Sequence, residues 1–293
     1  MHGVLVKDKK ELTDAEKEAD LAAGNEAMNL LKSLIKSKRD QDMSALDKTL
    51  EILKLNPELG LAWNFRREII LSALSVECLL KELELLNSVM VHQQMTKSYC
   101  LWNHRRWILL KLKVIEGVDD SVIDKELNLV STILQLDSRN FHSWSYRKWL
   151  CDNFPISDRM DDVAYSLSLI GKDFSNYSAW FLRRRAFERI GEVPNPMDEL
   201  ELVWNALFTE PTDQSCWQYH DWLLEREYER LHEQDARFMC ELEEVVDDKD
   251  SKYLLLSKLR NHGADERQEI LENLARIDPM RKGYYMDQMI SGK

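Results

Sequence analysis

A tryptophan recurs along the chain at a nearly constant interval. The five residues lie 39, 42, 36 and 37 positions apart and are Trp63, Trp102, Trp144, Trp180 and Trp217. Tryptophan is a rare residue, so this spacing indicates an internal repeat rather than chance. A period of that length is typical of a helical hairpin that buries its apolar face only by stacking on neighbouring hairpins. We therefore expect a curved solenoid with the tryptophans between repeats.

Polar residues mark the expected start of the helix that carries each tryptophan. Seven positions before four of them stand Asn56, Asp137, Asp173 and Glu210, and Pro57 and Pro211 follow the first and the last. Asn or Asp followed by Pro is typical of a helix N-terminus, so each tryptophan should lie about two turns into its helix. Around Asp137, Leu136 and Phe141 are expected to form a hydrophobic staple.

Further helices are expected between and beyond these units. Apolar residues recur at helical spacing in the segments LDKTLEILKL, IDKELNLVSTILQL and MDELELVWNALF, which predict the other helix of each pair. Asp278 and Pro279 lead to Tyr285 as a sixth unit, and a weaker unit surrounds Tyr253. Near the N-terminus, Thr13 and Glu16 form a capping box before a first helix.

Basic residues follow the tryptophan at the third and fourth positions in the first four repeats. The fifth repeat has His220 and Asp221 there instead. The Trp-x-x-Arg-Arg pattern fits either a phosphate-binding surface or arginines that pair with carboxylates and stack on tryptophan. We favour pairing with carboxylates of other helices and stacking on tryptophan.

Composition limits the classes of function. A net charge of −12 argues against general nucleic-acid binding, and no apolar run reaches the roughly 20 residues that span a bilayer. The five cysteines show no CxxC spacing, and the N-terminus MHGVLVKDKKE does not resemble a secretory signal. These features predict a cytoplasmic protein without a membrane-spanning segment.

The residues alone define no catalytic constellation, since Gly-rich phosphate loops, HExxH and GxSxG are all absent from the sequence. Three polar residues still stand out, because they lie where the repeats would converge on one surface. They are Lys97, Asn140 and His142. Lys97 is either a solvated helix residue or a point charge for an anion. Asn140 is either a residue that caps a helix or hydrogen-bonds between repeats, or part of the same site.

The repeats resemble the α-subunit repeat of protein prenyltransferases. The segments KSYCLWNHRRW, RNFHSWSYRKW, FSNYSAWFLRR, DQSCWQYHDWLL and DPMRKGYY are similar to the α subunits of Rab geranylgeranyltransferases in particular. The resemblance implies an all-α fold, a right-handed, crescent-shaped superhelical solenoid of hairpins. It implies one domain over residues 1–293, with an N-terminal segment and first helix in 1–40 and six to seven repeats in 41–293.

Site residues follow from the same resemblance. Lys97 matches the lysine that reaches the prenyl diphosphate across the subunit interface, and Tyr99, Asn140 and His142 match residues that line this junction. His2 matches an N-terminal histidine that can ligate the zinc of the β subunit in an inhibitory state. Zinc is expected on the β subunit and not on this chain, and magnesium is a further candidate cofactor.

The implied activity is geranylgeranyl transfer from geranylgeranyl diphosphate to C-terminal cysteines of Rab GTPases. The chain would act only with a β subunit, on a Rab presented by an escort protein. Two alternatives stay open: the α subunit shared by farnesyltransferase and type I geranylgeranyltransferase, acting on CaaX proteins, and a non-catalytic tetratricopeptide-like adaptor. Cys100, where the farnesyl type has Gln, and Phe141, where it has Tyr, favour Rab substrates over CaaX substrates.

Overall fold

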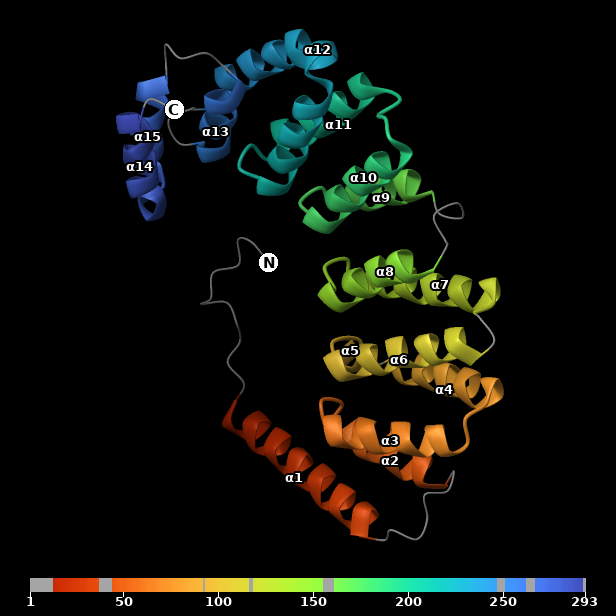
Figure 1. Ribbon diagram of the computed structural model, residues 1–293. Coiled ribbons are helices and arrows are strands. Elements are labelled where there is room, and N and C mark those ends of the chain that lie inside the picture. The colour runs from red at the N-terminus through yellow and green to blue at the C-terminus, as the bar shows by residue number, and fades with distance from the viewer. Residues whose placement is uncertain are drawn as a thin grey trace. The chain divides into compact units, whose positions relative to one another are not determined.

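The computed structural model describes residues 13–36, 44–91, 93–115, 118–154, 161–246, 251–261 and 267–291. All regular secondary structure in these ranges is helical, which confirms the expected all-α class (Figure 1). None of the helices in the described ranges is long and apolar enough to cross a membrane. The chain divides into two compact units, Met1–Arg159 and Met160–Lys293, which we call unit 1 and unit 2.

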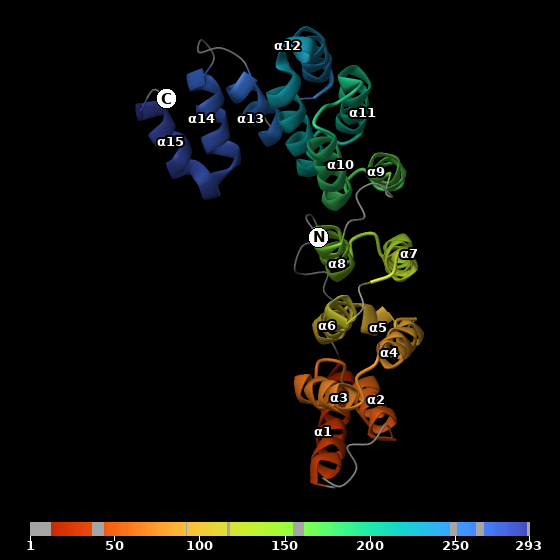
Figure 2. The same ribbon diagram turned by 45° about the vertical axis from the view of Figure 1, so that its right-hand side comes forward.

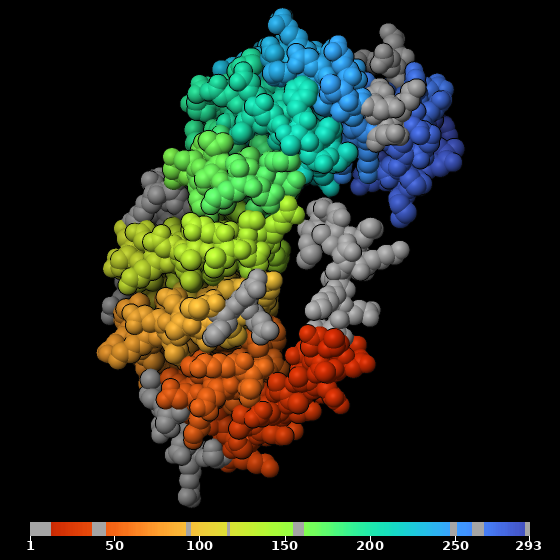
Figure 3. Space-filling model, turned by 180° about the vertical axis from the view of Figure 1, so that it is seen from behind, coloured from red at the N-terminus to blue at the C-terminus, as the bar shows by residue number. Residues whose placement is uncertain are grey.

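Unit 1 consists of hairpins that follow one long helix. Its helices are α1 (Asp14–Lys36), α2 (Ser44–Leu55), α3 (Gly60–Ser72), α4 (Val76–Val89), α5 (Gln93–Thr96), α6 (Tyr99–Ile115), α7 (Asp120–Leu136) and α8 (Phe141–Asn153). Figure 2 shows α3, α6 and α8 in one layer and α2, α4 and α7 in a second layer beside it. On the face shown in Figure 3, the side chains of successive hairpins from α2 to α8 meet directly.

Unit 2 continues the hairpin pattern and ends in shorter helices. Its elements are α9 (Asp162–Ile170), α10 (Tyr177–Ile190), α11 (Pro196–Thr209), α12 (Gln214–Val245), α13 (Lys252–Asn261), α14 (Arg267–Ile277), the 3₁₀ helix η5 (Pro279–Arg281) and α15 (Lys282–Ser291). The three apolar segments singled out in the sequence form α2, α7 and α11, as predicted.

The predicted capping box at the N-terminal end of the chain is confirmed, whereas Asp278 precedes only the short 3₁₀ helix η5 and makes no cap hydrogen bond with its side chain. The Thr13 N–H donates to the Glu16 carboxylate at 2.7 Å, and the Glu16 N–H donates to the Thr13 hydroxyl at 3.3 Å. This reciprocal capping box begins α1. In the sixth unit, the Tyr285 hydroxyl donates to the Asp278 carboxylate at 3.0 Å, and Tyr285 is buried.

Each repeat tryptophan closes the turn that precedes its helix. The indole N–H donates to the backbone carbonyl six residues earlier in all five repeats, at 2.6 to 2.9 Å. Trp144 is half-buried and the other four are buried, so the rings form core between helices as expected. The regular spacing therefore reflects a bond that recurs in each hairpin, because a turn carbonyl that is buried or partly buried needs a donor.

The predicted N-caps are wrong by three residues. Asp137 and Glu210 are C-caps of the preceding helices, and the next helices are capped by Asn140 and Asp213. In each case the two caps are the first and last residues of a four-residue turn, closed by a backbone bond such as Asn140 N–H to Asp137 O at 3.0 Å. Each tryptophan thus lies one turn into its helix, not two. The predicted staple is also absent, because Leu136 and Phe141 are 86% and 75% exposed.

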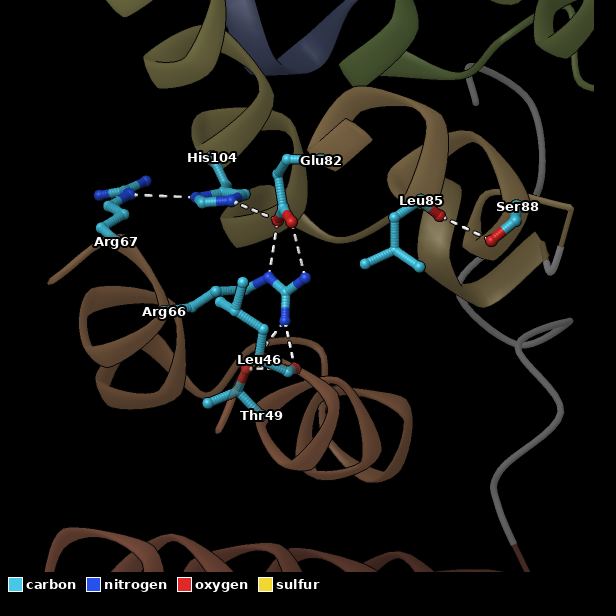
Figure 4. A network of polar contacts seen from close by, with 8 residues as sticks. All are labelled: Leu46, Thr49, Arg66, Arg67, Glu82, Leu85, Ser88 and His104. Atoms are coloured by element: carbon cyan, nitrogen blue, oxygen red, sulfur yellow. Dashed lines mark hydrogen bonds and ion pairs between the residues drawn. The ribbon is translucent and has the colours of Figure 1, made fainter. Parts of the chain in front are cut away.

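The first arginine after the tryptophan is used for packing. Arg66 on α3 donates through Nε and Nη2 to the two oxygens of Glu82 on α4, both at 2.6 Å (Figure 4). The same carboxylate lies 2.9 Å from Nε2 of His104 on α6. Both Arg66 and Glu82 are nearly inaccessible to solvent. We call this arrangement, a buried carboxylate bound by donors from two helices, a carboxylate lock.

Two more locks have the same design. Glu126 on α7 accepts from Arg105 on α6 and from the Tyr146 hydroxyl on α8 at 2.7 Å. In unit 2, Glu199 on α11 accepts from Arg183 on α10 and from the Tyr219 hydroxyl on α12 at 2.7 Å. In all three locks the carboxylate of one repeat holds the arginine of the repeat before it, so the locks fix how consecutive hairpins stack.

The second basic residue covers a tryptophan of the next repeat. The guanidinium groups lie 5.6 to 5.7 Å from the ring centroids in three pairs: Arg67 with Trp107, Arg106 with Trp149, and Arg184 with Trp222. Guanidinium groups stack favourably on indole faces at this distance. The Trp-x-x-Arg-Arg pattern is therefore confirmed as pairing and stacking within the scaffold at these positions.

The fifth repeat keeps the lock with other residues. His220 Nε2 lies 2.7 Å from Asp235 Oδ1, and the Trp204 indole N–H donates to the same oxygen at 2.8 Å. His220 and Asp235 belong to one helix and lie 15 positions apart, which a straight helix would separate by about 22 Å. The bond forms because α12 kinks at Glu227, where φ is −120° and ψ is 27°.

Candidate functional site

The turns before α3, α6 and α8 form a continuous edge of unit 1 (Figure 1). They comprise residues 56–59, 96–98 and 137–140, and we call this surface the turn edge. The Ser98 hydroxyl donates to the Pro57 carbonyl at 3.1 Å, which joins the first two turns. The Asn140 amide donates to the Thr96 carbonyl at 3.4 Å, which joins the second and third. Three successive repeats thus hold one another at this edge.

Lys97 is an exposed cation on a rigid backbone. Its neighbours Thr96 and Ser98 are 5% and 2% exposed. The Thr96 carbonyl accepts from the Trp102 indole at 2.8 Å, and the Ser98 N–H donates to the Met95 carbonyl at 3.1 Å. The Lys97 side chain itself is 58% exposed. Buried and hydrogen-bonded flanks fix where the side chain begins, while its ammonium group stays accessible.

Asn140 is a structural part of the turn edge. Its side chain is 4% exposed, and its Oδ1 accepts from the Ser143 N–H at 3.0 Å as the N-cap of α8. Its amide nitrogen lies 3.4 and 3.5 Å from the carbonyl and hydroxyl oxygens of Thr96. The structure therefore joins Asn140 to the turn that carries Lys97, through the backbone of Thr96.

Tyr99 and His142 lie in the first turns of α6 and α8, beside these residues in sequence. Tyr99 is 63% exposed. His142 is half-buried, with its ring edge-on to Phe141 at a centroid distance of 5.7 Å. Tyr99 and Phe141 are the first residues of α6 and α8, so each places exposed aromatic area directly after a turn of the turn edge.

The proposed zinc ligand His2 lies outside the described residues. Within the described ranges, no group of three or more His, Cys, Asp and Glu side chains is arranged to hold a metal ion.

The chemistry of the turn edge suits an anion. α6 and α8 begin at this edge, so their first N–H groups add positive potential near the Lys97 ammonium group. A lysine acts as a compact point charge on a flexible stem, which adapts to a phosphate oxygen without fixed geometry.

Sequence reasoning did not identify two residues of this site. Asp137, read as a helix start, has its carboxylate Oδ2 3.9 Å from the Lys97 ammonium nitrogen. Thr96 joins the two turns through its carbonyl and hydroxyl oxygens. A signal for Asp137 was present, because polar residues recur in pairs three positions apart: Asp137 with Asn140, Asp173 with Asn176, and Glu210 with Asp213.

The fold and the turn edge together define a helical-hairpin repeat scaffold with an exposed cation on one edge. The sequence pattern described as "Protein prenyltransferase alpha subunit repeat" matches residues 79–112, 123–154, 160–190 and 196–227. The Saccharomyces cerevisiae protein named "Geranylgeranyl transferase type-2 subunit alpha" is 32% identical over 78% of this chain and 73% of its own length. The chain belongs to the protein prenyltransferase α-subunit repeat family.

Other similar proteins carry the same name or the same fold. The Candida albicans protein of that name is 28% identical over 84% of this chain and 85% of its own length. The Sus scrofa protein is 38% identical over 63% of this chain, which spans about a third (34%) of that relative's length. A solved chain of "Candida albicans protein geranylgeranyltransferase-I complexed with GGPP" superposes with a TM-score of 0.69, at 24% identity, over 89% of this chain and 88% of that one. At that identity the likeness concerns the fold.

Proposed function

We propose that this chain is the α subunit of a heterodimeric Rab geranylgeranyltransferase, active only with a β subunit. The enzyme would transfer geranylgeranyl from geranylgeranyl diphosphate to C-terminal cysteines of Rab GTPases presented by an escort protein in the cytoplasm. Family membership and the names of the relatives support this proposal. Residues 1–293 would act as one α-subunit scaffold.

The placement of Lys97 carries the proposal. A tetratricopeptide-like adaptor has no use for an accessible lysine whose two flanking residues are buried and held by neighbouring repeats. A diphosphate leaving group, in contrast, gains negative charge as its allylic C–O bond breaks. An ammonium group positioned at that oxygen stabilises the transition state more than the ground state.

The other site residues would serve the junction with the β subunit. Tyr99 and Phe141 offer exposed aromatic surface of the kind that protein interfaces bury. Asn140 would keep the turn of Lys97 in place, and His142 would line the same junction. Zinc bound to the β subunit would favour the thiolate form of the Rab cysteine. His2 would reach that zinc only in an inhibited state.

Reconstitution tests the proposed function. The chain is co-expressed with candidate prenyltransferase β subunits, purified by size-exclusion chromatography, and assayed with geranylgeranyl diphosphate. We expect a stable heterodimer that modifies a Rab only when escort protein is present. Transfer to CaaX peptides without escort protein would identify the shared α subunit instead, and failure to bind any β subunit would favour the adaptor.

Substitution of Lys97 tests the catalytic assignment. In the reconstituted enzyme, Lys97→Ala should lower the transfer rate on the order of a hundredfold, as loss of one preorganised charge commonly does. Lys148→Ala is a matched control, because Lys148 is also 58% exposed but lies in the α8 helix, where it pairs with Asp152. Equal rates for the two variants would refute the role of Lys97.

A further inference from the structure

Lys97 faces a carboxylate from the next repeat. The Lys97 ammonium nitrogen lies 3.9 Å from Oδ2 of Asp137, whose side chain is 26% exposed. Asp137 is held from both sides, since its N–H donates to the Ile133 carbonyl at 2.8 Å and its carbonyl accepts from Asn140 at 3.0 Å. The carboxylate is thus presented to Lys97 by a rigid turn.

The equivalent residues of other turns have a local role. The side chains of Asn56, Asp173 and Glu210 each accept the backbone N–H two residues further on, at 3.1, 3.1 and 3.2 Å. A neutral amide is therefore sufficient at this position of the turn, as Asn56 shows. At Asp137 the negative charge itself has a partner, the Lys97 ammonium group.

The pair is suited to exchange rather than to permanent contact. Exposed ion pairs contribute little to stability, and 3.9 Å is longer than a charge-assisted hydrogen bond. A diphosphate carries more charge than one carboxylate, so it can take the ammonium group from Asp137. When the anion leaves, Asp137 is available again at the same distance.

We infer that Asp137 is the resting partner of the Lys97 ammonium group and competes with diphosphate for it. Asp137 is a positioning residue here, because it acts on the anion through Lys97. The competition would lower the affinity of the site for diphosphate, and so favour release of the pyrophosphate product. This inference rests on the proposed function of Lys97.

Inorganic pyrophosphate is the probe for this competition. In the heterodimer, inhibition of geranylgeranyl transfer by pyrophosphate is titrated for the wild-type enzyme and for Asp137→Asn. We expect Asp137→Asn to bind pyrophosphate about two- to fivefold tighter, the range given by an exposed ion pair. In a Lys97→Ala background, Asp137→Asn should change the inhibition constant of pyrophosphate by less than half the factor seen with Lys97 present.

Two further measurements separate competition from a structural effect. Asp137→Glu, which keeps the charge, should bind pyrophosphate as the wild-type enzyme does. Added salt should narrow the gap between wild type and Asp137→Asn, because screening weakens the exposed pair. Asp137→Asn should also have the same unfolding temperature as the wild-type enzyme, since the equivalent turn before α3 has an asparagine, Asn56, at this position.

The outcomes are decisive in each direction. An unchanged or weaker pyrophosphate affinity in Asp137→Asn, or an equal effect with and without Lys97, overturns the inference while leaving the proposed function intact. If the wild-type heterodimer transfers no geranylgeranyl, the proposed function and the inference fail together.

Discussion

The Glu82 lock of unit 1 and the Asp235 lock of unit 2 solve one packing problem with different charges. In unit 1, a guanidinium and an imidazole surround Glu82. In unit 2, an imidazole and an indole surround Asp235. Both carboxylates are 4% exposed. The lock therefore requires a buried anion with at least two donors, and arginine is one of several residues that supply them.

Charge is the physical difference between the two locks. Arg66 is always protonated, so the Glu82 lock contains an obligatory buried cation. An imidazole has a neutral form and an indole carries no charge, so the donors of the Asp235 lock do not include an obligatory cation. The two locks should thus respond differently when the carboxylate is neutralised.

Glu82→Gln should lower the free energy of unfolding more than the other substitutions considered below. The substitution leaves the Arg66 guanidinium buried without its counter-ion, which typically costs about 3–5 kcal/mol of the free energy of unfolding. Urea unfolding of the full chain, followed by circular dichroism, measures the loss. A loss below about 1 kcal/mol would mean that solvent or another group compensates Arg66, and the comparison of the locks would break down.

Low pH should remove most of the difference in unfolding free energy between wild type and Glu82→Gln. Burial alone would raise the pKa of Glu82, but hydrogen bonds and charge from His104 and Arg66 lower it from 4.5 to about 2. The folded pKa is depressed, so the stabilisation is complete above pH 4.5 and is lost as pH falls towards 2. The gap between wild type and Glu82→Gln should shrink across this window in unfolding experiments. A gap that stays constant would contradict the pKa assignment.

Asp235→Asn should cost less than Glu82→Gln. The amide oxygen can still accept from Trp204 or His220, so the loss is that of weakened hydrogen bonds in a buried site, about 1–3 kcal/mol. The same urea unfolding experiment gives the value. If the loss equals that of Glu82→Gln, His220 is a buried cation as obligatory as Arg66.

The tyrosines of the Glu126 and Glu199 locks should behave alike. Tyr146→Phe and Tyr219→Phe each remove one hydroxyl that donates to a carboxylate at 2.7 Å. Each should cost about 1.5 kcal/mol, because the carboxylate keeps its arginine and the ring keeps its packing. Unfolding of both variants compares the two units directly. A difference above about 1 kcal/mol would show that the locks are not equivalent.

Much of the scaffold could be predicted because it follows from local patterns. The bond from each repeat tryptophan to the preceding turn, the apolar spacing of α2, α7 and α11, and the Thr13–Glu16 capping box all act within one helix or one turn. The predicted caps were wrong because Asp137 and Asn140 are both cap formers and lie three positions apart. Only the path of the turn decides which of them ends one helix and which begins the next.

The locks show where prediction from sequence stops. Pairing of Arg66 and Arg105 with carboxylates was expected, but their partners Glu82 and Glu126 lie 16 and 21 positions away. Each partner is one Glu among many on a predicted helix. The pairing distance depends on hairpin length, which varies from repeat to repeat.

The sequence by itself determined the repeat, the helical class, the family resemblance and the prominence of Lys97 and Asn140. Tertiary structure alone decided that Asn140 fixes the turn of Lys97, that Asp137 faces its ammonium group, and that His220 replaces an arginine through the kink at Glu227. The physical reason is that helix formation depends on residues close together in the sequence. A contact between repeats depends on the length of the hairpin that separates the two residues in the sequence.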